Sequence, residues 1–504
     1  MRFALNFFRS IAWAGFLPYL SRSRVEACPA LITAISIPTC TVQDITLVDA
    51  SHAQLGSLDL NAAPFRLSEA PSSAARQSTA ENTEMTKAID SRQVAERMLS
   101  WVDLELVSCT ELQALWAGYG HVCAIEARGK SAETTERWCK ELGDDVYCAD
   151  RDTFRLILKF VSPPPAVDSQ DEGHLRKIMS YQVEQAFYEE VAGGLDESTV
   201  VPVCLVSTRS SPALEGVAEL RHVTATLLTD LRPKFPIAGE KRAALNERQV
   251  SAALNWLARF HGNYWKGPVS HFDRLVLPPL EEYRRRNPGG NREHGWVGDA
   301  LWLNGGYTYL ATRRTEYSYL AEDESSEWST AFCDPVAEGQ AASTAETVAE
   351  FLTPKGRPFE TYIHGDVKSE NLFSTEDGQQ VAFYDFQYVG MGLGVCDLAK
   401  LFTCSVPLSM LVDSAVTEHS LPMGKGEKQL LEQYRETLLE NRHARGNFQY
   451  DWDVFVRHWE CALVDWCRFQ ASWGFWGNTA WLEARTRSIL ADEGWRQWLL
   501  QNTE

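Results

Sequence analysis

The stretch between residues 361 and 402 holds the densest set of side chains that could do chemistry. Asp366 follows a short apolar run, Asn371 comes five residues later, and Asp385 ends the next apolar run. Phosphoryl transfer needs a base beside the attacking hydroxyl and oxygen ligands that hold Mg²⁺ against the phosphates. Asp366 is a candidate for the base, and Asn371 and Asp385 are candidates for the metal, which takes few protein ligands. The spacing therefore predicts a phosphoryl-transfer site.

The elements that must position this segment change character along the chain. Before residue 232, apolar runs typical of strands alternate with glycines and prolines, and a helical pattern follows the clearest run, 154–161. After residue 246 apolar residues recur at helical spacing, and the last hundred residues are helical and rich in tryptophan. Residues 280–350 are interrupted by Pro, Gly and acidic residues, and we expect an insertion with little regular structure.

The motif His-Gly-Asp-x-x-x-x-Asn at 364–371, followed by Asp-Phe-Gln at 385–387, resembles the aminoglycoside phosphotransferase / choline kinase superfamily. It looks closest to the ecdysteroid-kinase-like and choline-kinase-like branch, although choline kinases usually carry Asn where Gly365 stands. The resemblance covers roughly residues 100–480. It implies an α+β, two-lobed, protein-kinase-like fold, with a small antiparallel β lobe carrying one helix and a larger, mainly helical lobe. It also implies ATP and Mg²⁺ as cofactors.

The resemblance extends upstream to residues that would bind the nucleotide. Lys159 occupies the place of the strand lysine that holds the α- and β-phosphates, and Glu184 matches the helix glutamate that pairs with it. Such an ion pair orients a flexible lysine toward phosphate. The alternative for Lys159 is a solvated charge at a sheet edge, and Glu172, Glu189 and Glu190 are rivals for the helix position.

Two further segments match the expected nucleotide site. Gly118 and Gly120 lie between two strand-like runs and fit a loop that covers phosphates, since glycine lets backbone amides approach the nucleotide; a plain hairpin turn would explain them as well. Asp230 and Leu231 follow a strand-like run where the superfamily has its hinge between lobes, whose backbone would bind adenine. Asp230 can alternatively cap a turn.

Structural roles are expected for His364 and for Asp397, which matches an Asp-Leu-Ala stretch that usually supports the catalytic loop in the superfamily. Only eleven residues separate Asp385 from Asp397. A protein kinase needs a long activation segment and an Ala-Pro-Glu element there to hold a peptide. We therefore expect a small hydroxylated molecule as the phosphate acceptor.

Four residues near the C-terminus lie where the superfamily builds its acceptor pocket: Asp465, Arg468, Trp473 and Trp476. Aromatic faces beside carboxylates suit a cation, and they suit an apolar ring system equally. The alternative for the tryptophans is packing between helices. Arg313, in the insertion, is a candidate contact for an anionic group of the substrate.

The chain of 504 residues is long for one domain. We expect an N-terminal leader and linker at 1–89, a kinase-like N-lobe at 90–232, and a helical C-lobe at 233–504 that contains the catalytic segment. The first 25 residues carry four arginines and no acidic residue. They fit a mitochondrial-type presequence, a weak secretory signal, a disordered leader or a start codon placed too far upstream. A cytoplasmic location is the expectation, and a mitochondrial one is the alternative.

Composition excludes some partners. The formal net charge of −20 argues against nucleic acid, because a polyanion needs a basic face. The apolar run near the N-terminus has about ten residues, too few to cross a bilayer, and no other run predicts a membrane span. The twelve cysteines form no Cys-x-x-Cys pair and no zinc-type cluster, which indicates ordinary thiols in a reducing compartment.

These observations together predict an ATP- and Mg²⁺-dependent phosphotransferase that phosphorylates a hydroxyl group of a small molecule. The alternative is a pseudokinase that binds nucleotide or acts as a scaffold without turnover. Loss of the base or of a metal ligand usually marks such a protein, whereas Asp366, Asn371 and Asp385 are all present. The poor glycine loop and the rival helix glutamates favour the alternative.

Overall fold

The computed structural model of the chain describes residues 90–115, 118–143, 145–164, 170–209, 223–265, 272–287, 301–413, 418–440 and 449–503. The expected leader and linker at 1–89 lie outside the described residues, as do residues 288–300 of the expected insertion. What we expect of the leader and linker therefore stays a prediction.

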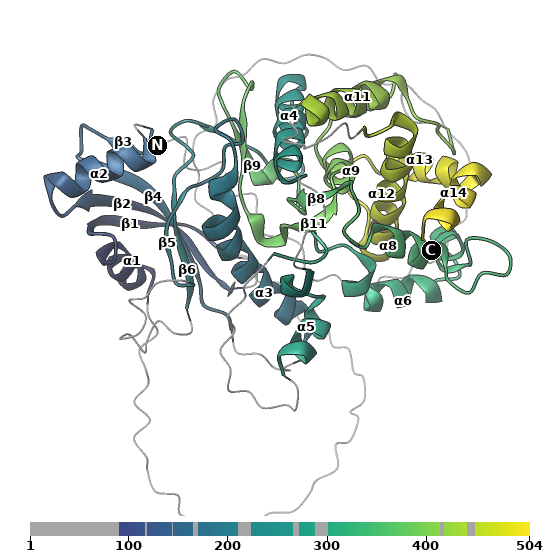
Figure 1. The fold of residues 1–504 in the computed structure, drawn as a ribbon, viewed down its shortest axis with the longest axis horizontal. Coiled ribbons are helices and arrows are strands. Elements are labelled where there is room, and N and C mark those ends of the chain that lie inside the picture. The colour runs from purple at the N-terminus through teal and green to yellow at the C-terminus, as the bar shows by residue number, and fades with distance from the viewer. Residues whose placement is uncertain are drawn as a thin grey trace, which may run out of the picture. The chain divides into compact units, whose positions relative to one another are not determined.

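An antiparallel sheet forms the first part of the described chain (Figure 1). Its strands are β1 (Leu104–Ala114), β2 (Gly120–Gly129), β3 (Tyr147–Cys148), β4 (Thr153–Val161), β5 (Cys204–Ser207) and β6 (Thr224–Thr229). They lie in the order β1-β2-β4-β6-β5, and β3 pairs with the start of β4. Side chains alternate along β4, so that Leu156, Leu158 and Phe160 enter an apolar core and Lys159 points to the opposite face.

Three helices accompany this sheet: α1 (Ser91–Ser100), α2 (Ala132–Leu142) and α3 (Glu172–Ala186). α1 begins with a capping box formed by Asp90 and Gln93. α2 occupies residues expected to be a charged connector; Ser131 caps its first turn, and Trp138 is its buried side chain. This lobe therefore holds more helices than the single one predicted.

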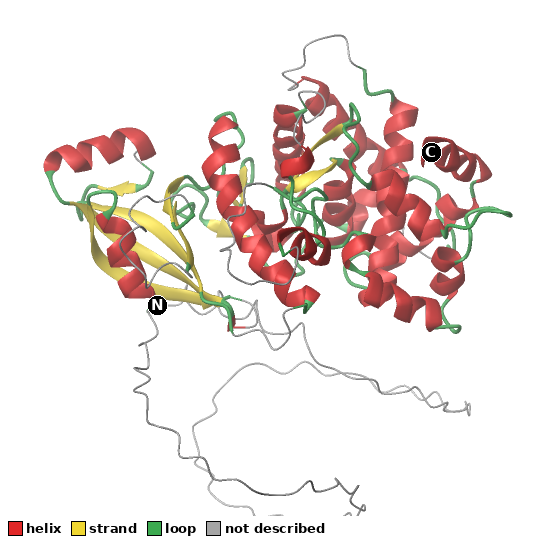
Figure 2. Cartoon of the chain, turned by 60° about the horizontal axis from the view of Figure 1, so that its bottom comes forward, coloured by secondary structure: helices red, strands yellow, loops and turns green. Residues whose placement is uncertain are grey.

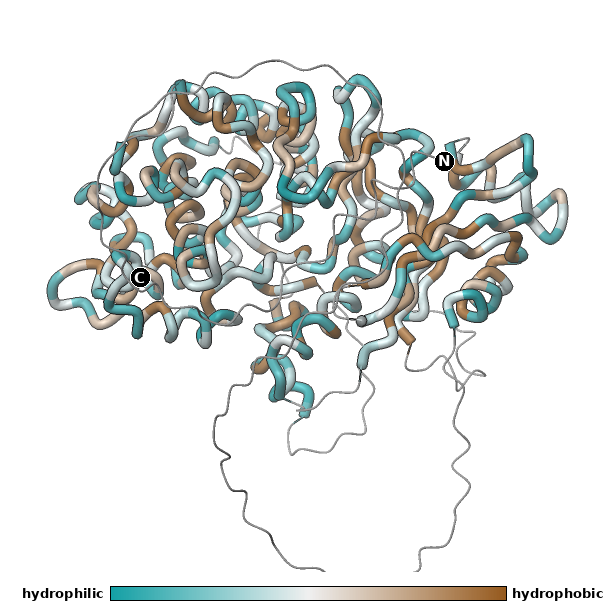
Figure 3. Tube along the Cα trace, turned by 180° about the vertical axis from the view of Figure 1, so that it is seen from behind, coloured by the Kyte–Doolittle hydropathy of each residue, from teal (hydrophilic) through white to brown (hydrophobic). Residues whose placement is uncertain are grey.

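The second part of the chain is mainly helical, as Figure 2 shows by colour. Its long helices are α4 (Glu247–Tyr264), α9 (Val395–Cys404), α11 (Lys425–Glu440), α12 (Trp452–Trp473), α13 (Thr479–Ala491) and α14 (Glu493–Thr503), and a short α10 (Leu408–Leu411) precedes α11. α12 packs against α9 and α13 and buries Trp459, Leu463 and Phe469 in the main apolar core. Apolar segments line the interior of both parts in the hydropathy view (Figure 3). The predicted α+β architecture is confirmed.

Two small sheets carry the catalytic segment. The three-stranded one contains β10 (Val381–Phe383), β9 (Leu372–Ser374) and β7 (Ile237–Ala238), and the two-stranded one pairs β11 (Gly390–Leu393) with β8 (Glu360–Ile363). β8 ends just before the His-Gly-Asp motif, and β11 begins just after Asp-Phe-Gln, with Ile363 opposite Gly390. The pairing brings both motifs to the same end of one antiparallel pair.

The expected insertion is more regular than its sequence indicates. It contains α5 (Pro279–Arg286), α6 (Arg314–Glu322), α7 (Glu327–Cys333) and α8 (Thr344–Leu352), so the expectation of little regular structure is wrong. Ser343 and Glu346 form a capping box at the start of α8, and Val348 and Phe351 are buried where α8 packs on α12 and α14. Helices this short give weak periodicity, and tertiary packing stabilises them.

No helix in the described parts of the chain is both long and apolar enough to cross a membrane.

Candidate active site

The loop after β8 has a backbone that only glycine fits at its second position. Gly365 has a φ of +82°, and a Cβ built there would lie 2.2 Å from the carbonyl oxygen of Tyr388 and 2.5 Å from the amide nitrogen of Gly306. Both clashes involve backbone, so a side chain at Gly365 would displace the loop. The motif glycine is therefore required by the close approach of three segments.

Asp397, near the start of α9, holds the same loop from behind. Its fully buried carboxylate accepts hydrogen bonds from the amides of His364 (2.7 Å) and Gly365 (2.9 Å) and from Nε2 of His261 (3.2 Å). Burial alone would raise the pKa of Asp397, but the bond from His261 and the surrounding positive charges hold it below its ordinary value. Lys400, one turn further along α9, donates to the carbonyl oxygen of Gly365 at 2.5 Å. α9 thus satisfies the polar backbone groups of the loop.

His364 also contacts the loop from within. Its Nε2 donates to the carbonyl oxygen of Tyr384 (3.1 Å), and its Nδ1 accepts from the amide of Asp366 (3.3 Å). The ring is fully buried, and burial lowers the pKa of His364. A neutral ring engaged at both nitrogens has no proton to exchange with a substrate, which fits the structural role expected for it.

Asp366 and Asn371 lie in direct contact. The Asn371 Nδ2 group donates to the Asp366 carbonyl oxygen (2.8 Å) and to Asp366 Oδ2 (3.0 Å), and Lys368 Nζ lies 3.0 Å from the same Oδ2. These contacts fix the Asp366 carboxylate. They also orient the Asn371 amide, so that its oxygen points away from Asp366.

Lys159 joins the two lobes. Its Nζ lies 2.6 Å from Glu184 Oε2 on α3 and 2.8 Å from Asp385 Oδ1. Burial raises the pKa of Glu184 to about 7, although Lys159 works in the opposite direction. Burial would also raise the pKa of Asp385, but the Lys159 ammonium outweighs it and holds this pKa below the ordinary value. The lysine and Asp385 are thus charged, and Glu184 is the group closest to protonation at neutral pH.

Asp385 itself is held in an unusual backbone conformation. Its φ of +67° places it in the left-handed region, which is uncommon for any residue but glycine. The next residue, Phe386, is fully buried and stacks on Phe187 with 3.9 Å between ring centroids. Gln387 donates to Asp385 Oδ1 (2.6 Å) and accepts from Ser180 on α3 (3.0 Å). α3 therefore positions Asp385 both through Lys159 and through Gln387.

The donor atoms near Asp385 fit a magnesium ion. Among the described residues, neither Asn371 Oδ1 nor Asp385 Oδ2 accepts a hydrogen bond, so one amide oxygen and one carboxylate oxygen are available. The described residues contain no group of three or more His, Cys, Asp or Glu that could hold a metal alone. Mg²⁺ commonly takes one or two protein ligands and completes its shell with phosphate and water. The donor set matches that requirement.

The predicted glycine loop lies against α3. Gly118 is exposed with a φ of +73°, and a Cβ at Gly120 would lie 2.0 Å from the carbonyl oxygen of Phe160. The side chain between them, Tyr119, is buried and its hydroxyl contacts His174 Nδ1 at 2.5 Å. Gly120 is thus required by packing against β4, while Gly118 has open space around it.

The predicted hinge residues follow β6 directly. The Asp230 carboxylate is bound by the Arg232 guanidinium (2.6–3.0 Å) and accepts from the Arg232 amide (3.0 Å), which is a turn-capping arrangement. Leu231 is half-buried. The Asp230 side chain therefore serves the turn, and only the backbone of this segment stays a candidate for adenine binding.

The residues predicted for the acceptor pocket differ in accessibility. Arg468 is fully buried and is bound to Asp465 Oδ1 (2.6 Å) and to the carbonyl oxygen of Thr308 (2.6 Å). It therefore ties α12 to the insertion, which does not support a substrate contact. Trp473 is 55% exposed and stacks on the Arg313 guanidinium, 4.9 Å from its ring centroid. Trp476 packs edge-on against Trp466.

The contacts of three residues near the motifs were not predicted from the sequence: Lys368, Gln387 and Lys400. Lys368 stands two residues after Asp366, and Gln387 two after Asp385, so their positions could have indicated contact with the predicted site. Lys400 approaches the loop only because α9 folds back beneath it, which no local pattern reveals.

The geometry defines a two-lobed, kinase-like fold in which the sheet lysine Lys159 contacts the motif carboxylate of Asp385 where the lobes meet. The model of the phosphotransferase enzyme family matches residues 142–427, more than half of the chain. The chain therefore belongs to that family, and the resemblance seen in its motifs is confirmed.

Other comparisons are less close. No curated protein matches the chain. Among solved structures, the macrolide 2′-phosphotransferase MphH from Brachybacterium faecium has 11% identity and a TM-score of 0.34 over 82% of this chain and 98% of its own. The Plasmodium vivax ethanolamine kinase has 10% identity and a TM-score of 0.35, over 78% and 84%. An aminoglycoside phosphotransferase from Alicyclobacillus acidocaldarius has 14% and 0.29, over 84% and 98%. Scores this low do not bear on substrate or cofactor.

Proposed function

We propose that the chain transfers the terminal phosphoryl group of ATP, with Mg²⁺, to a hydroxyl group of a small molecule. The observation that carries the proposal is the contact of Lys159 with both Glu184 and Asp385, beside the bonded pair Asp366–Asn371. A phosphate-binding cation, a base and two free oxygen ligands are the parts that phosphoryl transfer requires of a protein.

Each side chain has a separate task in the proposed reaction. Lys159, oriented by Glu184, binds the phosphates of the nucleotide, and Asn371 Oδ1 and Asp385 Oδ2 hold Mg²⁺. Bound Mg²⁺ supplies charge neutralisation on the phosphate oxygens. Asp366 accepts the proton of the acceptor hydroxyl. The hydroxyl oxygen of the acceptor bonds to the γ-phosphorus of ATP, and the bond between this phosphorus and the oxygen of the leaving ADP breaks. Lys368, 3.0 Å from Asp366, keeps a positive charge beside the transferred group.

A small acceptor is proposed because of how the chain runs after Asp385. Residues 386–393 form one 3₁₀ turn and β11, and α9 follows directly at Val395. The described residues at this place offer no extended platform that would hold a peptide.

The test is ADP release by the purified chain with Mg-ATP and fractions of a hydroxylated-metabolite extract. We expect at least one fraction to drive release, and Asp366→Asn to lower the rate by about 10²–10⁴-fold with nucleotide affinity kept, since a general base contributes that much. Asp150→Asn, a change of the same chemistry at an exposed turn, is the matched control and should leave the rate unchanged.

Two results would count against the proposal. Equal rates for the wild type and Asp366→Asn would remove Asp366 as the base. Mg-ATP binding without turnover in any fraction would favour the pseudokinase alternative.

A further inference from the structure

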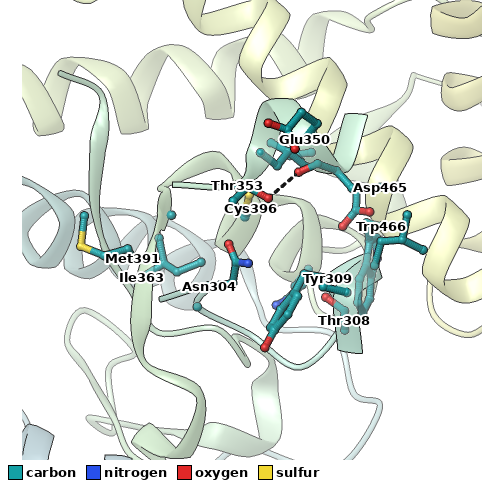
Figure 4. Close-up of a pocket in the computed structure, with 18 of the residues that line it drawn as sticks. Asn304, Thr308, Tyr309, Glu350, Thr353, Ile363, Met391, Cys396, Asp465 and Trp466 are labelled. Carbon is teal, nitrogen blue, oxygen red and sulfur yellow. Dashed lines mark hydrogen bonds between the residues drawn. The ribbon is translucent and has the colours of Figure 1, made fainter. Parts of the chain in front are cut away.

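A cavity of about 190 Å³ lies behind the catalytic loop (Figure 4). Ile363 and Met391 of the β8–β11 pair line one side, and Asp465 and Trp466 of α12 line another, with Cys396 of α9 between them. Its lining contains none of the residues proposed to bind nucleotide or to act as the base, and of the four residues predicted for the acceptor pocket it contains Asp465 alone. The cavity is therefore a separate place in the fold.

Lys400 of α9 is a buried lysine in the lining of the cavity. Lys400 is 5% exposed, and its Nζ donates to the Gly365 carbonyl oxygen. No carboxylate oxygen of the described residues lies within 4.0 Å of this Nζ; the faces of Tyr307 (5.7 Å) and Trp466 (6.0 Å) flank it instead. An ammonium has three N–H donors, of which Gly365 uses one. Asp397, one turn earlier on α9, interacts electrostatically with Lys400 without a direct ion pair, so the spare N–H donors of Lys400 can bind an anionic group.

The neighbouring helix presents a carboxylate to the same cavity. Both contacts of Arg468 with Asp465 are made to Oδ1, at 3.1 and 2.6 Å. Oδ2 of Asp465 accepts no hydrogen bond from the described residues, and it is not a fully buried atom. One carboxylate oxygen thus stays open for a donor from a ligand.

The other two carboxylates of the lining already have cationic partners. Glu346 lies 2.9 Å from Arg314, and Glu350 lies 2.8 Å from Lys355. The side chains of these two pairs are 40–57% exposed, whereas Lys400 is 5% exposed and the Asp465 side chain 14%. Lys400 and Asp465 are therefore the least exposed charges of the lining, and they have opposite signs.

The packing of α9 on α12 brings these two residues to the same wall of the cavity. Lys400 Nζ lies 6.0 Å from the ring centroid of Trp466, the residue that follows Asp465 on α12.

We propose that this cavity binds a small zwitterion, an amino-acid-like molecule whose carboxylate meets Lys400 and whose ammonium meets Asp465. The apolar part of the wall, which includes Leu310, Leu352 and Ile363, receives a short hydrocarbon body. The volume is below that of sites for drug-sized ligands, so the occupant is a small metabolite. Because Lys400 also holds Gly365, the ligand contacts a side chain that supports the catalytic loop.

Three probes with the same hydrocarbon body test the two charges separately: L-leucine, 4-methylpentanoate, which lacks the ammonium, and 3-methylbutylamine, which lacks the carboxylate. Binding to the full chain without nucleotide is measured by ligand-observed NMR titration. We expect leucine to bind at least about tenfold more tightly than either singly charged probe, since a bond to a charged group has that effect. Equal affinities for the three probes, or no binding of leucine, would overturn the proposal.

Variants assign each charge to its residue. In Lys400→Met, which lacks the partner of the carboxylate, leucine should bind no more tightly than 3-methylbutylamine. In Asp465→Asn, which lacks the partner of the ammonium, leucine should bind no more tightly than 4-methylpentanoate. Glu350→Gln, which changes a paired carboxylate of the same wall, is the control and should keep the wild-type order. If Asp465→Asn keeps the wild-type order of the three affinities, the proposal is overturned. If Lys400→Met fails to fold, the affinities of the three probes for the wild type still test the proposal. The readout is binding alone, so its failure leaves the proposed phosphotransferase activity untouched.

Discussion

Replacing Lys159 by methionine should make the stability of the chain depend on pH in a way that the wild type does not. The substitution keeps the length of the side chain and removes the cation that contacts both Glu184 and Asp385. Removing one partner of a buried ion pair commonly costs about 3–5 kcal/mol, because a charge stays buried without compensation. The Glu184 side chain is 6% exposed, so its uncompensated charge accounts for most of this cost.

The expected pH window follows from the pKa of Glu184. In the wild type burial raises it to about 7, above the ordinary value of 4.5, so folding favours the protonated form. Stability from this group is therefore lost as pH rises from about 4.5 to about 7 and is constant above that. Without Lys159 the folded pKa rises further. The Lys159→Met variant should then keep losing stability above pH 7, by about 1.4 kcal/mol per pH unit.

Urea unfolding at pH 6, 7, 8 and 9 measures this slope, with the m-value checked for constancy. The double variant Lys159→Met/Glu184→Gln is the control, and its extra slope between pH 7 and 8 should disappear because the titrating group is gone. If Lys159→Met follows the wild type in parallel above pH 7, Glu184 is not the group that Lys159 compensates, and the inferred coupling is wrong.

Two further predictions concern other charged groups. Asp385→Asn should weaken Mg-ATP binding far more than binding of metal-free ATP, because it removes the proposed charged metal ligand. Calorimetry with and without Mg²⁺ measures both affinities. Equal losses of affinity would point to Lys159 as the affected contact instead. His458 is buried beside Tyr450, and burial lowers its pKa from 6.5 to about 3, so the unfolded state takes up the proton first as pH falls below about 6.5. By pH 5 this should cost about 2 kcal/mol of stability, and His458→Gln should flatten the acid limb of the unfolding curve, whereas an unchanged limb would show that other groups cause it.

The residues of the catalytic segment could be chosen from the sequence because their roles depend on spacing along one short stretch. Asp366 and Asn371 are five residues apart, and the structure places them in direct hydrogen-bond contact. Lys159 and Glu184 lie on different elements, yet each could be placed by the strand and helix patterns around it. Their chemical roles stay predictions, whereas their proximity is observed.

What the sequence could not supply depends on packing between distant segments. The helices of the insertion are seven to nine residues long, and the capping box of Ser343 and Glu346 was their main local signal. Arg468 was expected at the substrate because of its neighbours in sequence, but α12 turns it inward to Thr308, 160 residues away. The cavity behind the loop needs α8, α9, α12 and residues 304–311 together, so no single stretch could indicate it.

α9 contacts the catalytic loop through two residues, and one of them also lines the cavity behind the loop. Asp397 accepts from the amides of the loop, and Lys400, one turn later, donates to the carbonyl oxygen of Gly365. Asp397 is fully buried, is engaged at both oxygens and is not part of the cavity lining, so a ligand in the cavity does not contact it. Lys400 has spare donors and lines the cavity, so a bound anionic group can share it with Gly365. A ligand in the cavity would therefore act on the loop only through the hydrogen bond from Lys400 to the Gly365 carbonyl oxygen. Asp397 would keep the amides of His364 and Gly365 in place.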